Sequence, residues 1–193
     1  MSEITRIRRR RGAGPALFAV DLDGEPWVTV DEAALLRLGW HDGLELDDAA
    51  RRRGEHAARL GATERRAARL LAARPHARRE LEAKLARTAG GAPAREIVHR
   101  LSEHGLLDDE AYARRVASRR LAQGYGPARI EADLTRAGVT ATLVRDVLGD
   151  LGREEVLDAA RRVVGPDPDD ASWRRLVGRG FDPDLVEDVL GAP

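Results

Sequence analysis

Arginines, together with one tyrosine that stands between two glycines, are the residues of this sequence whose types and spacing could do chemistry. In GLLDDEAYARRVASRRLAQGYGPARI (residues 105–130), arginines recur through one helical pattern that stops at Gly124-Tyr125-Gly126-Pro127. A guanidinium carries a fork of N–H donors that matches a phosphate or a carboxylate. An aromatic ring beside basic groups can stack on a nucleic-acid base. The stretch therefore predicts either a solvated helix face or a surface that binds an anionic partner.

The arginines fall on two faces of a helix predicted over residues 109–122. Its apolar stripe consists of Tyr112, Val116, Ala117 and Leu121. Arg120 lies inside that stripe, so we expect its stem to be buried and its charge to be paired or turned back to solvent. Outward-facing arginines of this and the other helical patterns are, with Tyr125, our candidates for contact with a partner or DNA: Arg78, Arg79, Arg114, Arg115, Arg119, Arg129, Arg174, Arg175 and Arg179.

Tyr125 could act in three ways. A catalytic phenol is excluded, because no base or substrate pocket accompanies it in the sequence. The ring could pack across the corner between two helices with its hydroxyl on a neighbouring helix. It could instead contact a partner or stack on a base, and these last two roles remain open.

No pattern of catalytic or metal-binding residues accompanies the arginines. The sequence has no Walker loop, no G-x-G-x-x-G, no G-x-S-x-G and no H-E-x-x-H, and none of its five histidines pairs at i,i+4. It has no cysteine, which excludes disulfides and thiolate chemistry. The acidic run at residues 108–110 indicates a helix cap, and residues 165–170 indicate a loop ending in a cap. We expect a protein that is not an enzyme, with no metal and no cofactor.

Composition favours helices with shallow interfaces. Aromatic residues make up 4% of the 193 residues and charged residues 34%. The net charge is zero, yet residues 51–89 hold 12 basic and 4 acidic groups, whereas residues 145–193 hold 7 basic and 12 acidic groups. The only N-terminal apolar run, residues 16–20, is too short for a signal peptide or a membrane span. We expect a soluble, cytoplasmic monomer.

Residues 1–50 differ from the rest of the chain. ALFAVDLDGEPWVTV gives two β-prone runs around Asp23-Gly24, which is a strong hairpin signal. ITRIRRR can add a third strand, and DEAALLRLGW has the acidic start and glycine stop of a short helix. The sequence therefore predicts a small β-hairpin with a short helix over residues 1–50.

The remaining chain repeats itself. AGVTATLVRDVLG (137–149) and RGFDPDLVEDVLG (179–191) align at an offset of 42, and GGAPAREIVHRL is a weaker third copy. We expect the glycine before each of these helices to have positive φ, and Pro75 and Pro127 to lie in a first helical turn. Stacked units of this kind give an elongated array. The predicted boundaries are a linker with repeat 1 at 51–107, repeat 2 at 108–150 and repeat 3 at 151–193. The predicted helices are 63–73, 75–87, 93–103, 109–122, 127–136, 140–149, 153–164, 171–178 and 183–190.

A DNA-reading helix-turn-helix is the alternative that this pattern must be tested against. A recognition helix presents basic and amide side chains to the groove. Here the second helix of RIEADLTRAGVTATLVRDVLGDL places Arg145 beside Asp146 and Asp150. The pattern argues against operator recognition by these helices, while arginines elsewhere could still contact a nucleic-acid backbone.

Three segments resemble the RecX regulatory proteins, which modulate the RecA recombinase. They are RPHARRELEAKL, HGLLDDEAYARRVASRRLAQGYGPARIEADLTRAGV and WRRLVGRGFDPDLVEDVL, and the first 50 residues resemble the extension of longer members. One difference is Ala92, because the corresponding positions of the other repeats hold Val139 and Phe181. The resemblance covers nearly the whole chain.

This resemblance implies a bacterial, cytoplasmic, mainly α protein of tandem three-helix repeats. It implies binding to the RecA–DNA filament and inhibition of its ATP turnover, strand exchange and co-protease activity, within DNA repair, recombination and the SOS response. Some members also bind DNA directly. The alternative function is a general helical nucleic-acid-binding protein without a specific RecA role.

Overall fold

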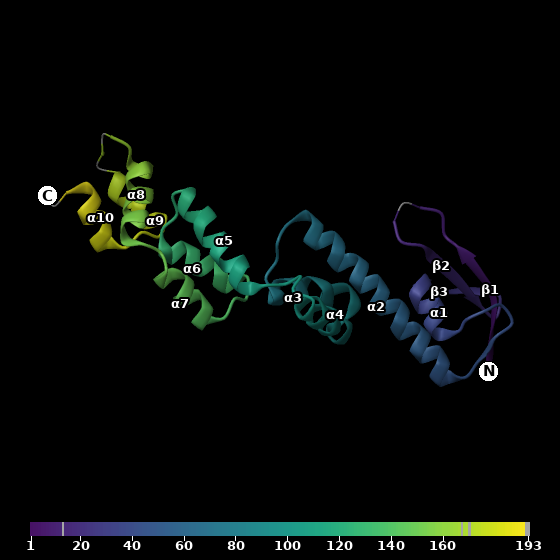
Figure 1. The fold of residues 1–193 in the computed structure, drawn as a ribbon. Coiled ribbons are helices and arrows are strands. Elements are labelled where there is room, and N and C mark those ends of the chain that lie inside the picture. Colours follow the sequence, from purple (N-terminus) through teal and green to yellow (C-terminus); the bar gives the residue numbers. More distant parts are fainter. Residues whose placement is uncertain (13, 167, 170, 192–193) are drawn as a thin grey trace. The chain divides into compact units, whose positions relative to one another are not determined.

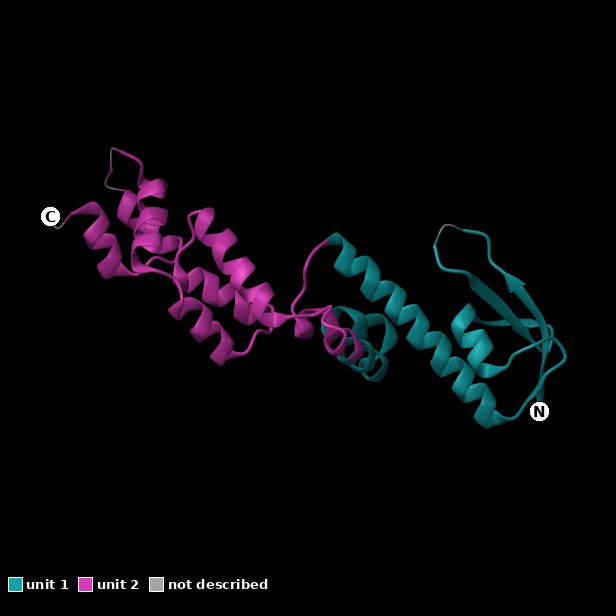
Figure 2. Ribbon diagram, in the orientation of Figure 1, with its two compact units in different colours: residues 1–73, 83–99 teal, residues 74–82, 100–193 magenta. Residues whose placement is uncertain are grey.

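The chain forms strands at its N-terminal end and helices along the rest (Figure 1). A computed structural model describes residues 1–12, 14–166, 168–169 and 171–191. Within these ranges there are four strands and ten helices, which confirms a mainly α protein with a small N-terminal β extension. Two compact units can be distinguished (Figure 2): residues 1–73 with 83–99, and residues 74–82 with 100–193.

The strands form one antiparallel sheet in the order β3-β2-β1-β4. β2 and β3 make the predicted hairpin, whose turn holds Asp23 and Gly24 at φ values of 50° and 87°. Two successive left-handed residues match the twist of the strands that they connect. The ITRIRRR segment lies in β1, as the sequence suggested, whereas the two-residue β4 was not predicted. The bounds are β1 Ser2–Arg9, β2 Leu17–Leu22, β3 Glu25–Asp31 and β4 Glu45–Leu46.

Two helices pack with this sheet into the N-terminal core. α1 (Glu32–Leu38) begins at Asp31, whose carboxylate accepts a hydrogen bond from the Ala34 N–H at 2.8 Å, and ends at Gly39 with φ 64°. An acidic cap and a left-handed glycine are the start and stop signals that the sequence carried. The predicted short helix is therefore confirmed.

The second helix, α2 (Asp48–Ala73), crosses a pair of tryptophans. The rings of Trp27 and Trp40 have centroids 5.2 Å apart. A Cβ atom at Gly54 would lie 2.4 Å from Cζ2 of Trp40 and 2.8 Å from Cη2 of Trp27. Only a residue without a side chain allows this close approach of helix and rings.

The length of α2 corrects one prediction. The first helix of repeat 1 was expected at 63–73, after a linker, but it begins at Asp48 and runs for 26 residues. Arginines occupy three of the five exposed positions of residues 51–62, and most of the inward residues there are small, so the apolar periodicity is weak. Residues 51–62 are helical because α2 packs on the N-terminal sheet around Gly54. This tertiary contact stabilises a segment whose own sequence pattern is a weak helix signal.

The predicted tandem three-helix architecture is confirmed in the helices that follow, whereas the exact repeat boundaries stay a prediction. Helices α5, α6, α8 and α10 have the predicted bounds, and the others differ by one to three residues at an end. They are α3 Arg78–Ala89, α4 Gly91–Glu103, α5 Asp109–Ala122, α6 Pro127–Arg136, α7 Ala141–Gly149, α8 Arg153–Val164, α9 Ser172–Gly178 and α10 Pro183–Leu190.

The start of α3 was predicted three residues too early. Pro75 lies before the helix, whereas Pro127 does occupy the first turn of α6. The Asp109 carboxylate accepts a hydrogen bond from the Arg78 N–H at 2.8 Å. The cap of α3 therefore comes from a residue 31 positions later in the chain, which no local signal around Pro75 contains.

Glycines with positive φ precede the last helix of each repeat, as predicted for Gly138 (82°) and Gly180 (87°). In the first repeat the left-handed residue is Gly90 rather than Gly91, which already lies in α4. Ala92 is exposed, whereas Val139 and Phe181 are buried in the core of the second unit.

The cap expected in residues 165–170 falls partly outside the described residues, because Asp167 and Asp170 are among those not described. Asp169 is described, and its carboxylate accepts a hydrogen bond from the Ser172 hydroxyl at 2.6 Å. That bond lowers the pKa of Asp169. The residue that caps α9 is Ala171, which has no capping side chain.

Candidate partner-binding surface

The corner between α5 and α6 gathers three arginines around one ring. The guanidinium carbons of Arg120, Arg129 and Arg179 lie 5.4, 5.7 and 5.4 Å from the centre of the Tyr125 ring. Each distance is within the range of a cation–π contact. Its hydroxyl makes no hydrogen bond among the described residues, so the expected bond to a neighbouring helix is not found. We name these four residues the arginine corner.

Backbone hydrogen bonds between the turn at Gly126 and the turn at Gly180 hold this arrangement in place. The Gly126 N–H donates to the carbonyl of Arg179 at 2.9 Å, and the Ala128 N–H donates to the carbonyl of Gly180 at 3.1 Å. A Cβ atom at Gly126 would lie 2.3 Å from the Gly180 oxygen. The start of α6 is therefore joined directly to the turn between α9 and α10, which brings Arg179 beside Tyr125.

A single carboxylate lies among the arginines of α5 and α6. Asp133, whose side chain is 10% exposed, has Arg136 Nη1 at 2.8 Å, Arg120 Nε at 2.9 Å and Arg129 Nε at 3.6 Å. The Arg120 contact is an ion pair without hydrogen-bond geometry. The prediction that Arg120 is paired is confirmed, and three positive charges share one negative charge.

Replacing Asp133 by asparagine should destabilise the protein by about 1–2 kcal/mol, because the half-buried Arg120 loses its counter-charge. The same change removes a negative charge, so the remaining arginines repel one another more strongly. Salt screens this repulsion, and the loss in melting temperature should therefore be smaller at high salt. Thermal unfolding followed by circular dichroism at low and high salt measures both effects. Asp146→Asn on α7, an exposed residue without an ion pair in the described structure, is the matched control and should stay within about 0.5 kcal/mol of the parent. Equal losses in both variants would contradict the role given to Asp133.

A hollow of about 290 Å³ lies beside the corner. Burial raises the pKa of the Tyr112 phenol in its wall, and the nearby Glu80 carboxylate raises it further, so the phenol stays protonated at neutral pH. The Arg74 guanidinium pairs with Glu80. The hollow is therefore polar and carries more arginines than carboxylates. Its lining is Arg74, Glu80, Tyr112, Val116, Arg119, Arg120, Asp133, Arg136 and Ala137.

A second hollow, of about 400 Å³, lies beside Gly124. Three arginines line it (Arg162, Arg175 and Arg179), and none of the described residues in its wall is a carboxylate. Arg179 also donates to the carbonyls of Gln123 and Gly124, each at 3.3 Å, so its position is fixed by the backbone. Basic side chains thus extend from α5 past the arginine corner to α8 and α9.

The predicted contact residues do not all belong to this surface. Tyr125, Arg129 and Arg179 meet in the arginine corner, and Arg119 lines the first hollow. Arg175 lines the second hollow and pairs with Asp169 at 2.5 Å.

Arg78, Arg79 and Arg114 have structural roles that the sequence did not show. Arg78 pairs with Asp109 through Nε at 3.3 Å. The stem of Arg79 covers Gly138, where an added Cβ would lie 2.5 Å from the Cβ of Arg79. Arg114 pairs with Glu110 at 3.1 Å and with Asp150 at 2.8 Å, and both hydrogen bonds raise its pKa.

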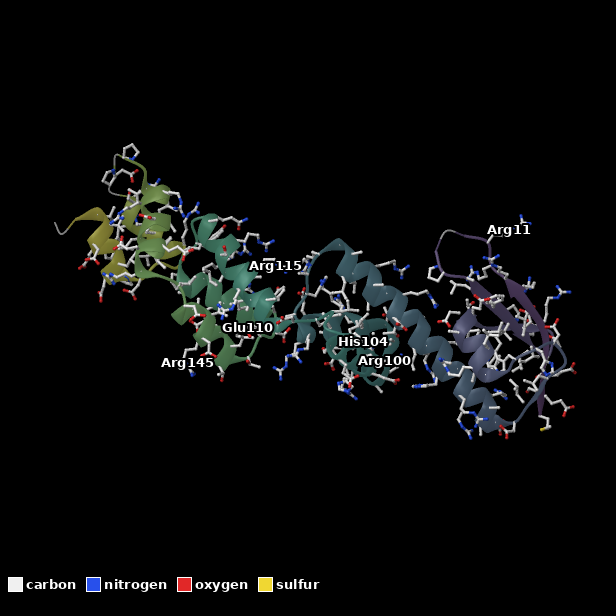
Figure 3. The ribbon with its side chains drawn as sticks, viewed as in Figure 1. Arg11, Arg100, His104, Glu110, Arg115 and Arg145 are labelled. Carbon is white, nitrogen blue, oxygen red and sulfur yellow. The ribbon has the colours of Figure 1, made fainter. Side chains whose placement is uncertain are left out.

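The two remaining candidates are exposed. Arg115 on α5, labelled in Figure 3, and Arg174 on α9 have no ion pair in the described part of the chain. Arg119 is likewise exposed without one. These side chains can therefore bind an external anion without first breaking an internal pair.

The sequence missed Arg120, Arg136 and Asp133 as members of this surface. A signal was present, since Arg129, Asp133 and Arg136 follow the i,i+4 and i,i+3 spacing of helical ion pairs. The approach of Arg179 to Tyr125, from a turn 54 residues further along the chain, had no local signal.

Other kinds of site are not found in the described residues. No group of three or more histidine, aspartate or glutamate side chains is placed to hold a metal ion there. None of the helices described is both long and apolar enough to cross a membrane.

Fold and surface together define a protein of tandem three-helix repeats with an arginine-rich face and a small N-terminal sheet. A sequence model described as "RecX, second three-helix domain" matches residues 108–148. A protein of Mycolicibacterium vanbaalenii named regulatory protein RecX is 37% identical over 172 residues, which cover 78% of this chain and 89% of that protein. The chain therefore belongs to the RecX family of regulatory proteins.

Other relatives agree with this assignment. Regulatory protein RecX of Thermus thermophilus is 41% identical over 115 residues, or 60% of this chain and 80% of that protein. A crystal structure of regulatory protein RecX superposes with a TM-score of 0.72 at 20% identity, over 98% of this chain and 99% of that one. RecX from Lactobacillus salivarius gives 0.58 at 19% identity, over 68% and 94%. At these identities the structural likeness shows the fold alone.

Proposed function

We propose that this protein regulates the RecA recombinase, mainly as an inhibitor, by binding the RecA–DNA filament. The proposal rests on membership of the RecX family and on one observation: the basic surface from α5 to α9 includes exposed arginines without internal partners in the described structure. Several modest contacts along a repeating filament would act together, so affinity would come from avidity more than from one deep pocket. This role places the protein in the cytoplasm, in DNA repair and the SOS response.

The proposed contact residues are the predicted candidates, ranked by what they touch. Arg115, Arg119 and Arg174 are free to meet acidic RecA groups or DNA phosphates. The arginine corner would add a rigid patch of charge. Arg78, Arg79 and Arg114 would contribute mainly by holding the helices that carry the others.

Adding the protein at substoichiometric amounts to RecA, ATP and single-stranded DNA should slow ATP hydrolysis and shorten the filaments. Unchanged hydrolysis and unchanged filament length would contradict the proposal. Salt-sensitive DNA binding together with no effect on RecA would favour the alternative, a general nucleic-acid-binding protein.

Reversing two exposed charges on α5, Arg115→Glu with Arg119→Glu, should raise the concentration needed for half-inhibition roughly tenfold, equivalent to about 1.4 kcal/mol. Both side chains are exposed to solvent, so the variant should fold like the parent. Arg145→Glu on α7, an exposed site labelled in Figure 3, is the matched control and should leave inhibition near the parent value. Full inhibition by the α5 variant would remove this face from the proposed interface.

A further inference from the structure

Two large apolar side chains lie exposed next to each other on α9. Trp173 is 37% exposed and Val177 is 39% exposed, and both belong to the few large apolar residues exposed in the described part of the chain. Residues four positions apart lie on the same face of a helix, so the two side chains are neighbours. A single exposed apolar residue is common on a protein surface, whereas tryptophan is enriched among the residues that contribute most to binding at interfaces.

The preceding repeat shows that the fold does not need apolar residues at these positions. At the offset of 42 residues that relates the last two repeats, Trp173 corresponds to Glu131 and Val177 corresponds to Thr135. Glu131 and Thr135 are exposed and polar, as expected for the outer face of a helix. The apolar pair on α9 is therefore not explained by the packing of the repeat.

The buried side of α9 holds the pair in a fixed position. α9 packs against α8 and α10 (Figure 1). Leu176 is fully buried in the core of the second unit. Ser172 is buried as well, and its hydroxyl donates to the Asp169 carboxylate at 2.6 Å. A surface that is already ordered loses little conformational entropy when a partner binds to it.

An arginine borders the apolar pair. Arg174 lies one residue after Trp173 and three residues before Val177, and it is exposed with no ion pair among the described residues. No aspartate or glutamate occurs between residues 172 and 178. The three side chains, which we name the α9 patch, therefore complement a surface that offers an apolar side chain beside a carboxylate. Tryptophan and arginine are also two of the residue types enriched at the centres of protein–protein interfaces.

The charge of the last repeat favours a protein over a nucleic acid as the occupant of the α9 patch. Residues 151–193 hold 6 basic and 10 acidic groups. On α10, Asp184 and Glu187 are exposed without an ion pair in the described structure. An excess of negative charge repels a phosphate backbone, whereas the burial of apolar area does not depend on it. Valine, in addition, has no flat face on which a base could stack.

We propose that the α9 patch binds the RecA protein itself, and not the DNA of the filament. This inference rests on the proposed function and adds a contact of another kind to it. Trp173 and Val177 would bury an apolar side chain of the RecA surface, and Arg174 would pair with a carboxylate beside it. Because ions in solution do not screen apolar burial, the contribution of Trp173 and Val177 should persist at salt concentrations that weaken the contacts of the α5 arginines.

Biolayer interferometry with the full-length protein can test this on two surfaces: biotinylated oligothymidylate alone, and the same oligonucleotide coated with RecA and a non-hydrolysable ATP analogue. Trp173→Ser with Val177→Ser should raise the Kd for the RecA-coated surface roughly tenfold and leave the Kd for the bare oligonucleotide within about twofold of the parent. The ratio of variant to parent Kd should stay the same as salt is raised. The matched control is Leu36→Ser with Leu106→Ser, which replaces two other exposed apolar residues and should bind both surfaces like the parent.

An unchanged Kd of the patch variant on the RecA-coated surface would overturn the inference, and so would an equal loss in the leucine control. An equal loss on bare oligothymidylate would overturn it as well, because it would mean that Trp173 stacks on a base. A parent protein that binds the RecA-coated surface no more tightly than the bare one would contradict the proposed function. Tight parent binding with an unaffected variant would contradict the inference alone.

A second variant serves if circular dichroism shows that the first does not fold. Val177→Ser with Arg174→Glu leaves the partly buried Trp173 in place and changes two exposed side chains. It should also bind the RecA-coated surface roughly tenfold more weakly, because it removes one apolar contact and reverses the charge that meets the carboxylate. Leu106→Ser with Arg145→Glu makes the same two changes at other exposed sites and should bind like the parent. Equal binding by these two variants would likewise overturn the inference.

Discussion

Replacing Gly126 by alanine should destabilise the protein by about 3 kcal/mol, the upper end of the range for overpacking. The added methyl would lie 2.3–2.4 Å from the backbone of Gly180 and Phe181. A side chain can rotate away from such a clash, but a backbone cannot. Relief requires separating the start of α6 from the α9–α10 turn, which breaks the hydrogen bonds of Gly126 and Ala128. For a chain of this size the midpoint of thermal unfolding should fall by roughly 6–12 °C.

Gly178 supplies the control for this experiment. It is the last residue of α9, and a Cβ there would meet no atom within 4 Å. Gly178→Ala should therefore be neutral or stabilising by up to about 1 kcal/mol, because alanine has the higher helix propensity. Equal melting temperatures for the Gly126 and Gly178 variants would show that Gly126 does not pack against the backbone of Gly180.

Replacing Gly54 by alanine should cost about 2–3 kcal/mol in the N-terminal unit, by overpacking against two rings. Trp27 and Trp40 have the flat surfaces that let α2 approach, and the methyl would meet both. Tryptophan emission reports this directly, since these are two of the three tryptophans of the chain. We expect a red-shifted spectrum and an unfolding transition at lower denaturant concentration.

Gly61→Ala is the matched substitution on the same helix. Its Cβ would meet only side-chain ends, that of Arg65 at 3.1 Å and the free carboxylate oxygen of Asp31, the cap of α1, at 3.2 Å. Helix propensity favours alanine by about 1 kcal/mol, so this variant should be neutral or slightly stabilised, with an unchanged spectrum. A spectrum for Gly54→Ala identical to that of the parent would rule out the stacked arrangement of α2 on the rings.

Much of the helical fold was predictable because its boundaries are marked locally. Pro127 begins α6, Gly138 and Gly180 have the left-handed backbone that ends a helix, and the offset of 42 residues identified a repeat. The failures occur where a distant residue decides the outcome. Asp109 determines where α3 begins, and the sheet with its tryptophans determines that α2 is continuous through residues 51–62.

The candidate surface was predictable in type but not in geometry. Helical periodicity correctly separated the exposed Arg115 and Arg119 from Arg120, which is held beside Asp133. Helical periodicity could not indicate that Arg179 would reach Tyr125, because that contact depends on how the turns at Gly126 and Gly180 pack against each other. Ion pairs between distant helices, such as Arg114 with Asp150, were invisible for the same reason.

The contact between Gly126 and Gly180 also limits how such a gene can change by duplication. At an offset of 49 residues Leu81 and Leu85 correspond to the buried Ile130 and Leu134, and the position that corresponds to Gly126 is Ala77. A shuffled chain that joined the first repeat directly to the third would therefore set a methyl group against the Gly180 backbone. The two junctions are therefore not interchangeable, because the second repeat has a glycine at the position that faces Gly180 and the first repeat has an alanine there.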